Sequence, residues 1–312
     1  MNKIVFLILQ AVLQSTAGTS LRILKENVVV LDVSDLSSSE VSLHCGEQYE
    51  GEQIRWERNE KSISETGNRI TVTIDGLRGG NFTCHRANHR ETLNYTLLLV
   101  HPVNFPKGVL TQSAHGEFVS CSARNYNGRF HCSWKWHEER KERAVVYFAA
   151  IRNSSLINCT LDSDISGLTC IDGDYCRYSE EPRSINLTLF VRNLYRLEEH
   201  QRTFFIRDIV QPDKVNMTKI QDDVFEWRPP KTWSFPCSFF PLSYEVKVVP
   251  NNHSCDSTGS RVEKVETIET HYKVNAKKPY TFCVRAQDKI AKTLWSDWSR
   301  HHIRKHRHTS QQ

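Results

Sequence analysis

The side chains that could do chemistry in this sequence are histidines, carboxylates and ten cysteines. His137-Glu138 begins like a zinc-protease motif, but Lys141 stands where that motif has its second histidine. The sequence contains no GXSXG nucleophile motif and no phosphate-binding loop. The histidine-rich residues 301–308 specify no ligand geometry. We therefore expect no enzymatic activity, no metal site and no cofactor.

Residues 1–20 predict a secretory signal peptide, in which a short basic start is followed by the apolar run Ile4–Leu9 and then by small residues. The alternatives are a buried strand or a membrane anchor. An anchor needs roughly 20 apolar residues, and Gln10 and Gln14 interrupt this run. No later stretch is long and apolar enough to span a bilayer. We expect cleavage within residues 17–20 and a soluble mature protein.

The rest of the composition fits an extracellular protein. Ten cysteines are typical of an oxidising compartment, where disulfides persist. Seven Asn-X-Ser/Thr sequons behind a signal peptide predict a glycosylated surface, and they begin at Asn81, Asn94, Asn153, Asn158, Asn186, Asn216 and Asn252. The net charge of +5 does not by itself imply nucleic acid. The basic cluster 300–308 is interpreted as a solvated tail, with attraction to sulfated polysaccharide as the alternative.

The chain reads as all-β, because short segments rich in β-branched and aromatic residues recur and helical periodicity does not. Such segments are 70–74, 144–151, 185–191, 244–249 and 280–286. Many short strands at this spacing favour stacked β-sandwiches. Prolines at 102, 106 and 212 mark the joints, so we predict three tandem sandwich domains at 21–103, 104–210 and 211–300, followed by a basic tail at 301–312.

The first domain carries an immunoglobulin-like signature, in which Cys45 is followed by Trp56 and then by Cys84. In an immunoglobulin sandwich two such cysteines bridge the facing sheets and the tryptophan packs on the bridge. Phe82 stands where a tyrosine usually hydrogen-bonds back to the chain. We expect the packing to be kept and that hydrogen bond to be lost.

The second and third domains carry two further signatures. Cys121 and Cys132, with Trp134 two residues on, fit a short cross-link between neighbouring antiparallel strands. The third domain ends in Trp295-Ser296-Asp297-Trp298-Ser299, which matches WSXWS. Together these patterns resemble class I cytokine receptors. The resemblance implies an immunoglobulin-like domain followed by two fibronectin type III-like cytokine-receptor domains.

The resemblance also implies a role for the tryptophans. In this family two such tryptophans project from one strand and stack on guanidinium groups of its neighbour, each contact being worth about 0.5–2 kcal/mol. Arg285, on the preceding strand, is the nearest partner for Trp295 and Trp298. We expect these residues to stabilise the domain, and the alternative is that they contact ligand.

Three local stretches narrow the resemblance to soluble, receptor-like subunits of heterodimeric cytokines: residues 125–130, 204–209 and 284–288. In that group the subunit clamps a four-helix alpha subunit, is secreted with it and presents it to cell-surface receptor chains in immune signalling. The first domain engages a receptor chain there. The family's aromatic after Leu-Asp is missing here, because Val33 follows Leu31-Asp32, so we name no receptor-docking residue.

Cysteine numbers leave one unpaired residue in the second domain. Beyond Cys121 and Cys132, the second domain holds three cysteines, Cys159, Cys170 and Cys176. Three cannot all pair with one another, and an odd cysteine in a secreted domain suggests an intermolecular bridge. The resemblance implies that Cys159–Cys170 is the internal bridge and that Cys176 joins the alpha subunit. The alternative is that Cys176 is a free or differently paired thiol.

The third domain also holds an odd number of cysteines, Cys237, Cys255 and Cys283. Two of them lie on or near strands that should be antiparallel neighbours. We therefore favour Cys255–Cys283 and leave Cys237 unassigned.

The resemblance further implies a partner-binding pocket at the joint of domains two and three. In the family this pocket holds an arginine of the alpha subunit between a carboxylate and aromatic rings. Tyr126 and Asp288 match it by their motifs, and Phe239 occupies another aromatic position as a phenyl ring. The alternative for Asp288 is a solvated loop carboxylate.

Two rival functions remain open. A soluble alpha-type receptor would bind its helical cytokine reversibly and would have no need of a bridge through Cys176. An adhesion or matrix protein would bind heparin through residues 300–312 and would have no cytokine partner.

Overall fold

The protein is all-β, as the sequence predicts. The computed structural model describes residues 19–88, 91–138, 142–175, 181–221, 223–234, 241–250, 253–258, 262–276 and 278–303. The helices among them are α1 (Ile206–Ile209) and the 3-10 turns η1 (Glu47–Tyr49) and η2 (Lys231–Ser234). None of these described helices has the length and apolar character that crossing a membrane requires. The immunoglobulin and fibronectin assignments stay predictions.

Two compact units make up the chain. The first comprises Met1–Phe118, Trp134–Phe148 and Thr188–Gln201, and the second comprises Val119–Ser133, Ala149–Leu187 and Arg202–Gln312. The boundaries between them cut through four strands that are described below. The division into three domains at residues 103 and 210 stays a prediction.

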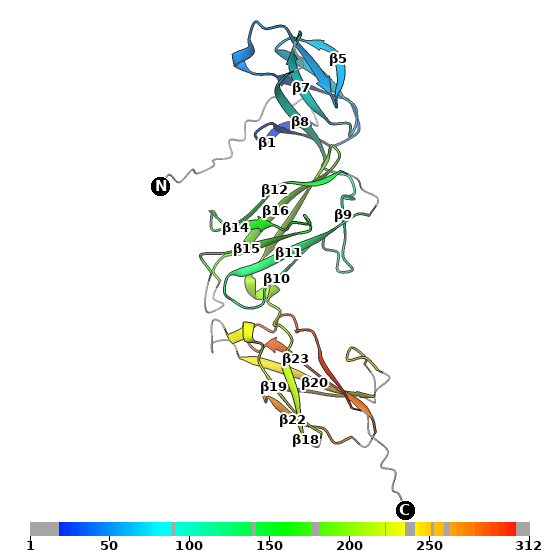
Figure 1. Cartoon of the computed structure of the whole chain (residues 1–312), viewed down its shortest axis with the longest axis vertical. Helices are drawn as coiled ribbons and strands as arrows, with labels where there is room; N and C mark the ends of the chain where they lie inside the picture. Colours follow the sequence, from blue (N-terminus) through cyan, green and yellow to red (C-terminus); the bar gives the residue numbers. More distant parts are fainter. Residues whose placement is uncertain are drawn as a thin grey trace, which may run out of the picture. The chain divides into compact units, whose positions relative to one another are not determined.

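The first group of strands (blue to cyan in Figure 1) forms two sheets. Its strands are β1 (Thr19–Lys25), β2 (Val28–Val33), β3 (Ser39–His44), β4 (Ile54–Arg58), β5 (Lys61–Thr66), β6 (Arg69–Ile74), β7 (Gly80–Arg86) and β8 (Thr92–Pro102). In one sheet β8, β7, β4 and β5 follow one another, and β2 joins β8 in parallel. In the other sheet β3 pairs with β6. β1 begins inside the predicted cleavage region, so a cut just before Thr19 would keep the whole strand.

Alternation of buried and exposed residues explains why these segments are strands. Residues of β6 alternate strictly between solvent and core, which is the period of a half-buried strand. Cys45, just after β3, is bonded to Cys84 on β7 and so links the two sheets. Trp56 is 1% exposed within this core and donates from Nε1 to the carbonyl oxygen of Gly67 at 2.9 Å. Phe82 is completely buried there.

The second group of strands lies in two sheets, and one of them is continuous with the larger sheet of the first group. Its strands are β9 (Leu110–Thr111), β10 (Val119–Ser122), β11 (Arg129–Trp136), β12 (Arg143–Arg152), β13 (Ser155–Leu156), β14 (Asn158–Leu161), β15 (Gly167–Ile171), β16 (Ile185–Asn193) and β17 (Arg196–Phe204). One sheet has the order β10-β11-β15-β14, with β9 beside β11, and in the other β13, β12, β16 and β17 follow one another. The boundaries of the two compact units fall within β11, β12, β16 and β17.

The third group (yellow to red in Figure 1) lies entirely in the second unit. One layer has the order β18-β19-β22 and the other the order β21-β20-β23-β24. Phe225 and Phe282, from opposite layers, stack with ring centroids 4.0 Å apart. The strands are β18 (Asn216–Gln221), β19 (Val224–Arg228), β20 (Leu242–Pro250), β21 (Glu263–Thr267), β22 (His271–Lys273), β23 (Tyr280–Asp288) and β24 (Ser299–Ile303). β24 therefore extends three residues into the segment interpreted as a tail.

A buried histidine–carboxylate pair lies on β17, in the part of that strand that belongs to the first compact unit. Glu198 accepts hydrogen bonds from the backbone N–H groups of Gly108 and Val109 at 2.7 and 3.0 Å. His200 is 3% exposed, with Nε2 3.5 Å from that carboxylate and its ring against Phe118. Burial lowers the pKa of His200, although the Glu198 carboxylate opposes that shift.

This lowered pKa predicts a pH dependence of folding. Between the native and unfolded pKa values of His200 the unfolded chain binds more protons, so the free energy of unfolding falls as the pH drops below about 6.5. We expect His200→Phe, which keeps an aromatic ring beside Phe118, to show a smaller loss. Urea unfolding at several pH values measures it, with exposed His115→Gln as the control. If the free energy of unfolding fell equally with pH in wild type and in His200→Phe, the pH dependence would not arise from His200.

Candidate partner-binding site

Two of the predicted pocket residues are in direct contact. The Tyr126 hydroxyl donates a hydrogen bond to Oδ2 of Asp288 at 2.7 Å, across 162 positions of sequence. Tyr126 is 2% exposed and Asp288 is completely buried. The alternative of a solvated loop carboxylate does not describe this geometry. Both residues belong to the second compact unit.

The loop that carries Tyr126 owes its shape to its own asparagines. Oδ1 of Asn125 accepts from the backbone N–H of Asn127 at 2.9 Å, and Oδ1 of Asn127 accepts from that of Arg129 at 3.0 Å. Asparagine side chains commonly form such turns, because they accept a hydrogen bond from the backbone two residues further along. Gly128 has φ 79°, and a Cβ there would lie 2.5 Å from the Asp172 carbonyl oxygen and 2.8 Å from Tyr175 Cβ. Only glycine therefore lets this loop pass so close to residues 172–175.

Asp288 in turn organises the segment that follows β23. Its Oδ1 accepts from the backbone N–H groups of Ile290 and Ala291 at 2.6 and 2.9 Å. Its carbonyl oxygen accepts from the N–H of Lys292 at 3.0 Å. With the Tyr126 hydroxyl, the N–H groups of Ile290 and Ala291 give three donors to a buried carboxylate that would otherwise cost several kcal/mol. The side chain of Ile290, beside this turn, is 65% exposed.

An aromatic side chain from η2, Trp233, also belongs to the described part of the site. The ring of Trp233 meets that of Tyr126 edge-on, with centroids 6.1 Å apart. Nδ2 of Asn125 donates to the carbonyl oxygen of Thr232 at 2.6 Å. The sequence prediction named Phe239 and missed Trp233, although both lie in one aromatic-rich stretch. Phe239 lies outside the described residues.

Three buried charges surround the same loop and were missed from the sequence. Arg152 lies between two carboxylates, with Nε 3.0 Å from Asp172 and Nη2 2.7 Å from Glu181. All three are at most 6% exposed. Glu181 also accepts from the backbone N–H groups of Ile206 and Arg207 at the start of α1, both at 3.0 Å. These residues lie too far apart in sequence for any local pattern to connect them.

The pKa directions agree with a site rich in buried negative charge. The pKa of Tyr126 is raised, first by burial and then by its hydrogen bond to the Asp288 carboxylate. Burial also raises the pKa of Asp172, and the Arg152 guanidinium opposes that shift. Tyr126 is therefore a neutral hydrogen-bond donor at physiological pH.

Four disulfides are present among the described residues: Cys45–Cys84, Cys121–Cys132, Cys159–Cys170 and Cys255–Cys283. They join the same pairs that the sequence analysis names. Cys176 and Cys237 lie outside the described residues. The described chain stops at Tyr175 and resumes at Glu181 on either side of Cys176.

Arg285 lies between the two tryptophans of the WSXWS segment. Its Cζ is 4.9 Å from the ring centroid of Trp295 and 4.3 Å from that of Trp298. Lys247 extends the stack, with Nζ 5.1 Å from the centroid of Trp298. The family pattern implies tryptophans on a strand, but here they precede β24, which begins at Ser299. Ser296 fixes the segment to β23, because its Oγ accepts from the backbone N–H of Ala286 at 2.9 Å.

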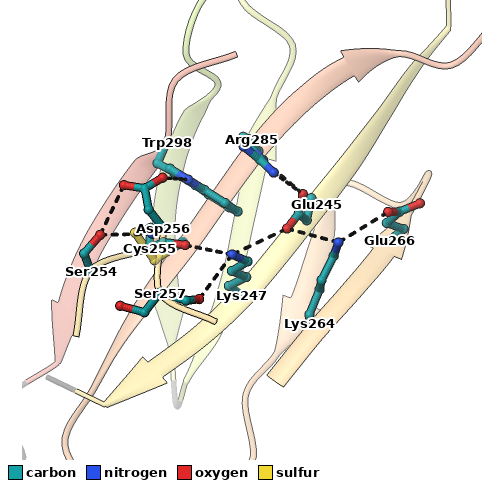
Figure 2. A network of polar contacts seen from close by, with 11 residues as sticks. Glu245, Lys247, Ser254, Cys255, Asp256, Ser257, Lys264, Glu266, Arg285 and Trp298 are labelled. Carbon is teal, nitrogen blue, oxygen red and sulfur yellow. Dashed lines mark hydrogen bonds and ion pairs between the residues drawn. A yellow bond between two sulfur atoms is a disulfide. The ribbon is translucent and has the colours of Figure 1, made fainter. Parts of the chain in front are cut away.

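A buried carboxylate balances the cations of this stack, as Figure 2 shows. Glu245 is 1% exposed and accepts from Arg285 Nε and Nη2 at 3.0 and 2.6 Å. Lys247 lies 3.8 Å from it and donates to the Cys255 carbonyl oxygen at 2.9 Å. Nε1 of Trp298 donates to Asp256 at 2.9 Å. Trp298 and Lys247 thus connect the disulfide loop to the sheet. Glu245 and Lys247 alternate with Tyr244, Val246 and Val248 along β20, so the sequence places them on the polar face of the strand and gives no local signal of their burial.

The sequons differ in accessibility. Asn153, Asn158, Asn186 and Asn216 are exposed, while Asn81 and Asn94 are partly buried and Asn252 lies outside the described residues. The Asn94 amide nitrogen already donates to the carbonyl oxygen of Cys45 at 2.7 Å.

The fold and the site define a class of protein. In the described part of the chain no group of three or more His, Cys, Asp or Glu side chains could hold a metal ion. The polar groups around Tyr126 and Asp288 are hydrogen-bonded within a rigid frame of strands and disulfides. This arrangement is that of a disulfide-bonded protein built almost entirely from β-sheets.

Comparison with known proteins identifies the relatives. Residues 116–193 match the family described as the C-terminus of cytokine interleukin-12p40. Interleukin-12 subunit beta of Homo sapiens is 26% identical over 307 residues, covering 88% of this chain and 91% of that protein. The Mesocricetus auratus protein of that name is 27% identical over 306 residues (88% and 90%), and that of Felis catus is 24% identical over 307 residues (88% and 91%).

These similarities confirm the predicted resemblance along most of the chain. The protein is a cytokine subunit related to interleukin-12 subunit beta, and it is not an enzyme.

The stack around Arg285 predicts a large stability effect. Arg285→Ala leaves Glu245 buried without its main partner, so we expect the free energy of unfolding to fall by about 3 kcal/mol. Lys264→Ala is the matched control, because Lys264 contacts the same carboxylate at 3.6 Å but its side chain is 52% exposed. Exposed ion pairs contribute about 0–1 kcal/mol. Guanidinium unfolding measures both variants, and equal losses would show that the stack contributes little.

Proposed function

We propose that this chain is the secreted, soluble, receptor-like subunit of a heterodimeric cytokine. It clamps a four-helix alpha subunit at the predicted joint of domains two and three and presents it to cell-surface receptor chains in immune signalling. Secretion follows from the predicted signal peptide at 1–20. The observation that carries the proposal is the buried contact between Tyr126 and Asp288, in a chain similar to interleukin-12 subunit beta over most of its length.

Charge supports an arginine as the partner group at this contact. Within the described residues Asp288, Asp172 and Glu181 are buried, with Arg152 as the cation between the last two. A carboxylate has about four acceptor positions, and described donors fill three of those of Asp288. A guanidinium suits the position left over, since it donates several hydrogen bonds in one plane.

The neighbourhood of Cys176 supports a covalent joint at the same place. Tyr175, the residue before it, lies against Gly128 in the loop that carries Tyr126. Glu181, on the other flank, is bound by Arg152. A bridge from Cys176 to the alpha subunit and an arginine at Asp288 would therefore act on one interface.

Other parts of the proposal rest on sequence alone. Phe239 would supply a further aromatic surface to the pocket, and the first domain would dock a receptor chain through residues that we do not name. The seven sequons would carry glycans. The basic tail at 301–312 would attract sulfated polysaccharide.

The bridge through Cys176 gives the direct test. We expect co-expression with candidate helical alpha subunits to yield a heterodimer that only reduction separates, and we expect Cys176→Ser to yield unlinked chains. Cys237→Ser is the matched control and should keep the link, because the bridge is expected from Cys176 and Cys237 is left unassigned. Non-reducing gels and disulfide mass mapping measure both. Cytokine binding that is reversible and indifferent to Cys176 would instead favour the soluble alpha-type receptor.

A further inference from the structure

A polar cleft lies within the first compact unit. It encloses about 660 Å³ between the β4–β5 turn, the loop before β7 and the β16–β17 turn. Its polar lining includes Arg58, Asn59, Asp75, Arg78 and Tyr195. Leu77 and Leu194 supply apolar surface, and Leu194 is 44% exposed.

The walls of this cleft are held together by close contacts. A Cβ on Gly79 would lie 2.3 Å from the Leu98 carbonyl oxygen and 2.7 Å from Tyr195 Cβ, so only glycine allows this approach. The Tyr195 hydroxyl donates to Oδ1 of Asn59 at 2.6 Å. The cleft is therefore formed before any ligand arrives, which reduces the entropy cost of binding.

Two arginines bring positive charge that no described carboxylate neutralises. Nη2 of Arg58 donates to the carbonyl oxygens of Arg78 and Gly79, and its guanidinium lies 5.4 Å from the centroid of Phe82. These contacts fix its position without cancelling its charge. The Arg78 side chain is exposed, and among the described residues neither arginine forms an ion pair. Arg196, at the edge, is paired with Glu198 at 3.1 Å.

We propose that this cleft binds an acidic saccharide. A sulfate or carboxylate group suits the guanidinium groups of Arg58 and Arg78, which donate in pairs to planar and tetrahedral anions. The Asp75 carboxylate would repel a bare anion. It favours a ligand that also carries hydroxyl groups, from which Asp75 can accept hydrogen bonds. Leu77 and Leu194 offer apolar surface to a sugar ring. This proposal is independent of the proposed cytokine function.

The test is calorimetric titration of the full-length glycoprotein with two probes. A heparin-derived hexasaccharide represents matrix polysaccharide, and sialyllactose represents the end of a cell-surface glycan. Whichever probe binds identifies the source. We expect Arg78→Ala to weaken binding about tenfold, the effect of losing one charged hydrogen bond, and we expect Asp75→Ala to weaken it as well. Arg183→Ala, an exposed arginine outside the cleft, should have no effect.

Three results would overturn the proposal. The first is that neither probe binds. The second is that Asp75→Ala strengthens binding, which would make the cleft a general anion-binding surface. The third is that Arg78→Ala has no effect while the combined substitution Arg304→Ala, Lys305→Ala and Arg307→Ala abolishes binding, which would assign the saccharide to the tail. Arg78 and Asp75 are exposed, so unchanged melting temperatures are expected and are measured alongside.

Discussion

A carboxylate that is completely buried needs hydrogen-bond donors in place of water, and Asp288 receives three of them from two distant segments. The Tyr126 hydroxyl comes from the loop before β11, and two backbone N–H groups come from the turn after β23. Losing one donor would leave a charge with no water to replace it. The loop and the turn therefore keep one mutual arrangement, and the site is formed in the free protein. Partner binding then costs little conformational entropy.

The same constraint recurs wherever this chain buries charge. Glu245 forms an ion pair with Arg285, which itself lies between two tryptophans. Arg152 lies between two carboxylates beside the Tyr126 loop. Buried ion pairs are weak sources of stability, because desolvation offsets their attraction. Breaking one is costly, however, so they hold neighbouring segments in register. In this chain they fix the disulfide loop at Cys255 and the described flanks of Cys176.

The sequence predicts much of this because its strongest signals are local. Short runs rich in β-branched and aromatic residues placed β6, β12, β16, β20 and β23 to within two residues, since such residues favour strands. The resemblance to class I cytokine receptors paired Arg285 with the tryptophans, because it implies a guanidinium group on the strand that precedes them. Arg152 and Glu181 meet only after the chain folds, and no local pattern marks them. Trp233 was missed for the same reason, since its contact with Tyr126 spans more than a hundred residues.

The central claim is that an alpha subunit binds at the contact between Tyr126 and Asp288. Hydrogen–deuterium exchange of the free chain and of the heterodimer tests it most directly, because it reports each segment separately. The account predicts slower exchange in residues 125–129 and 288–292 of the heterodimer, with little change in β3 and β6. Unchanged exchange in both segments, with protection confined to other parts of the chain, would contradict it.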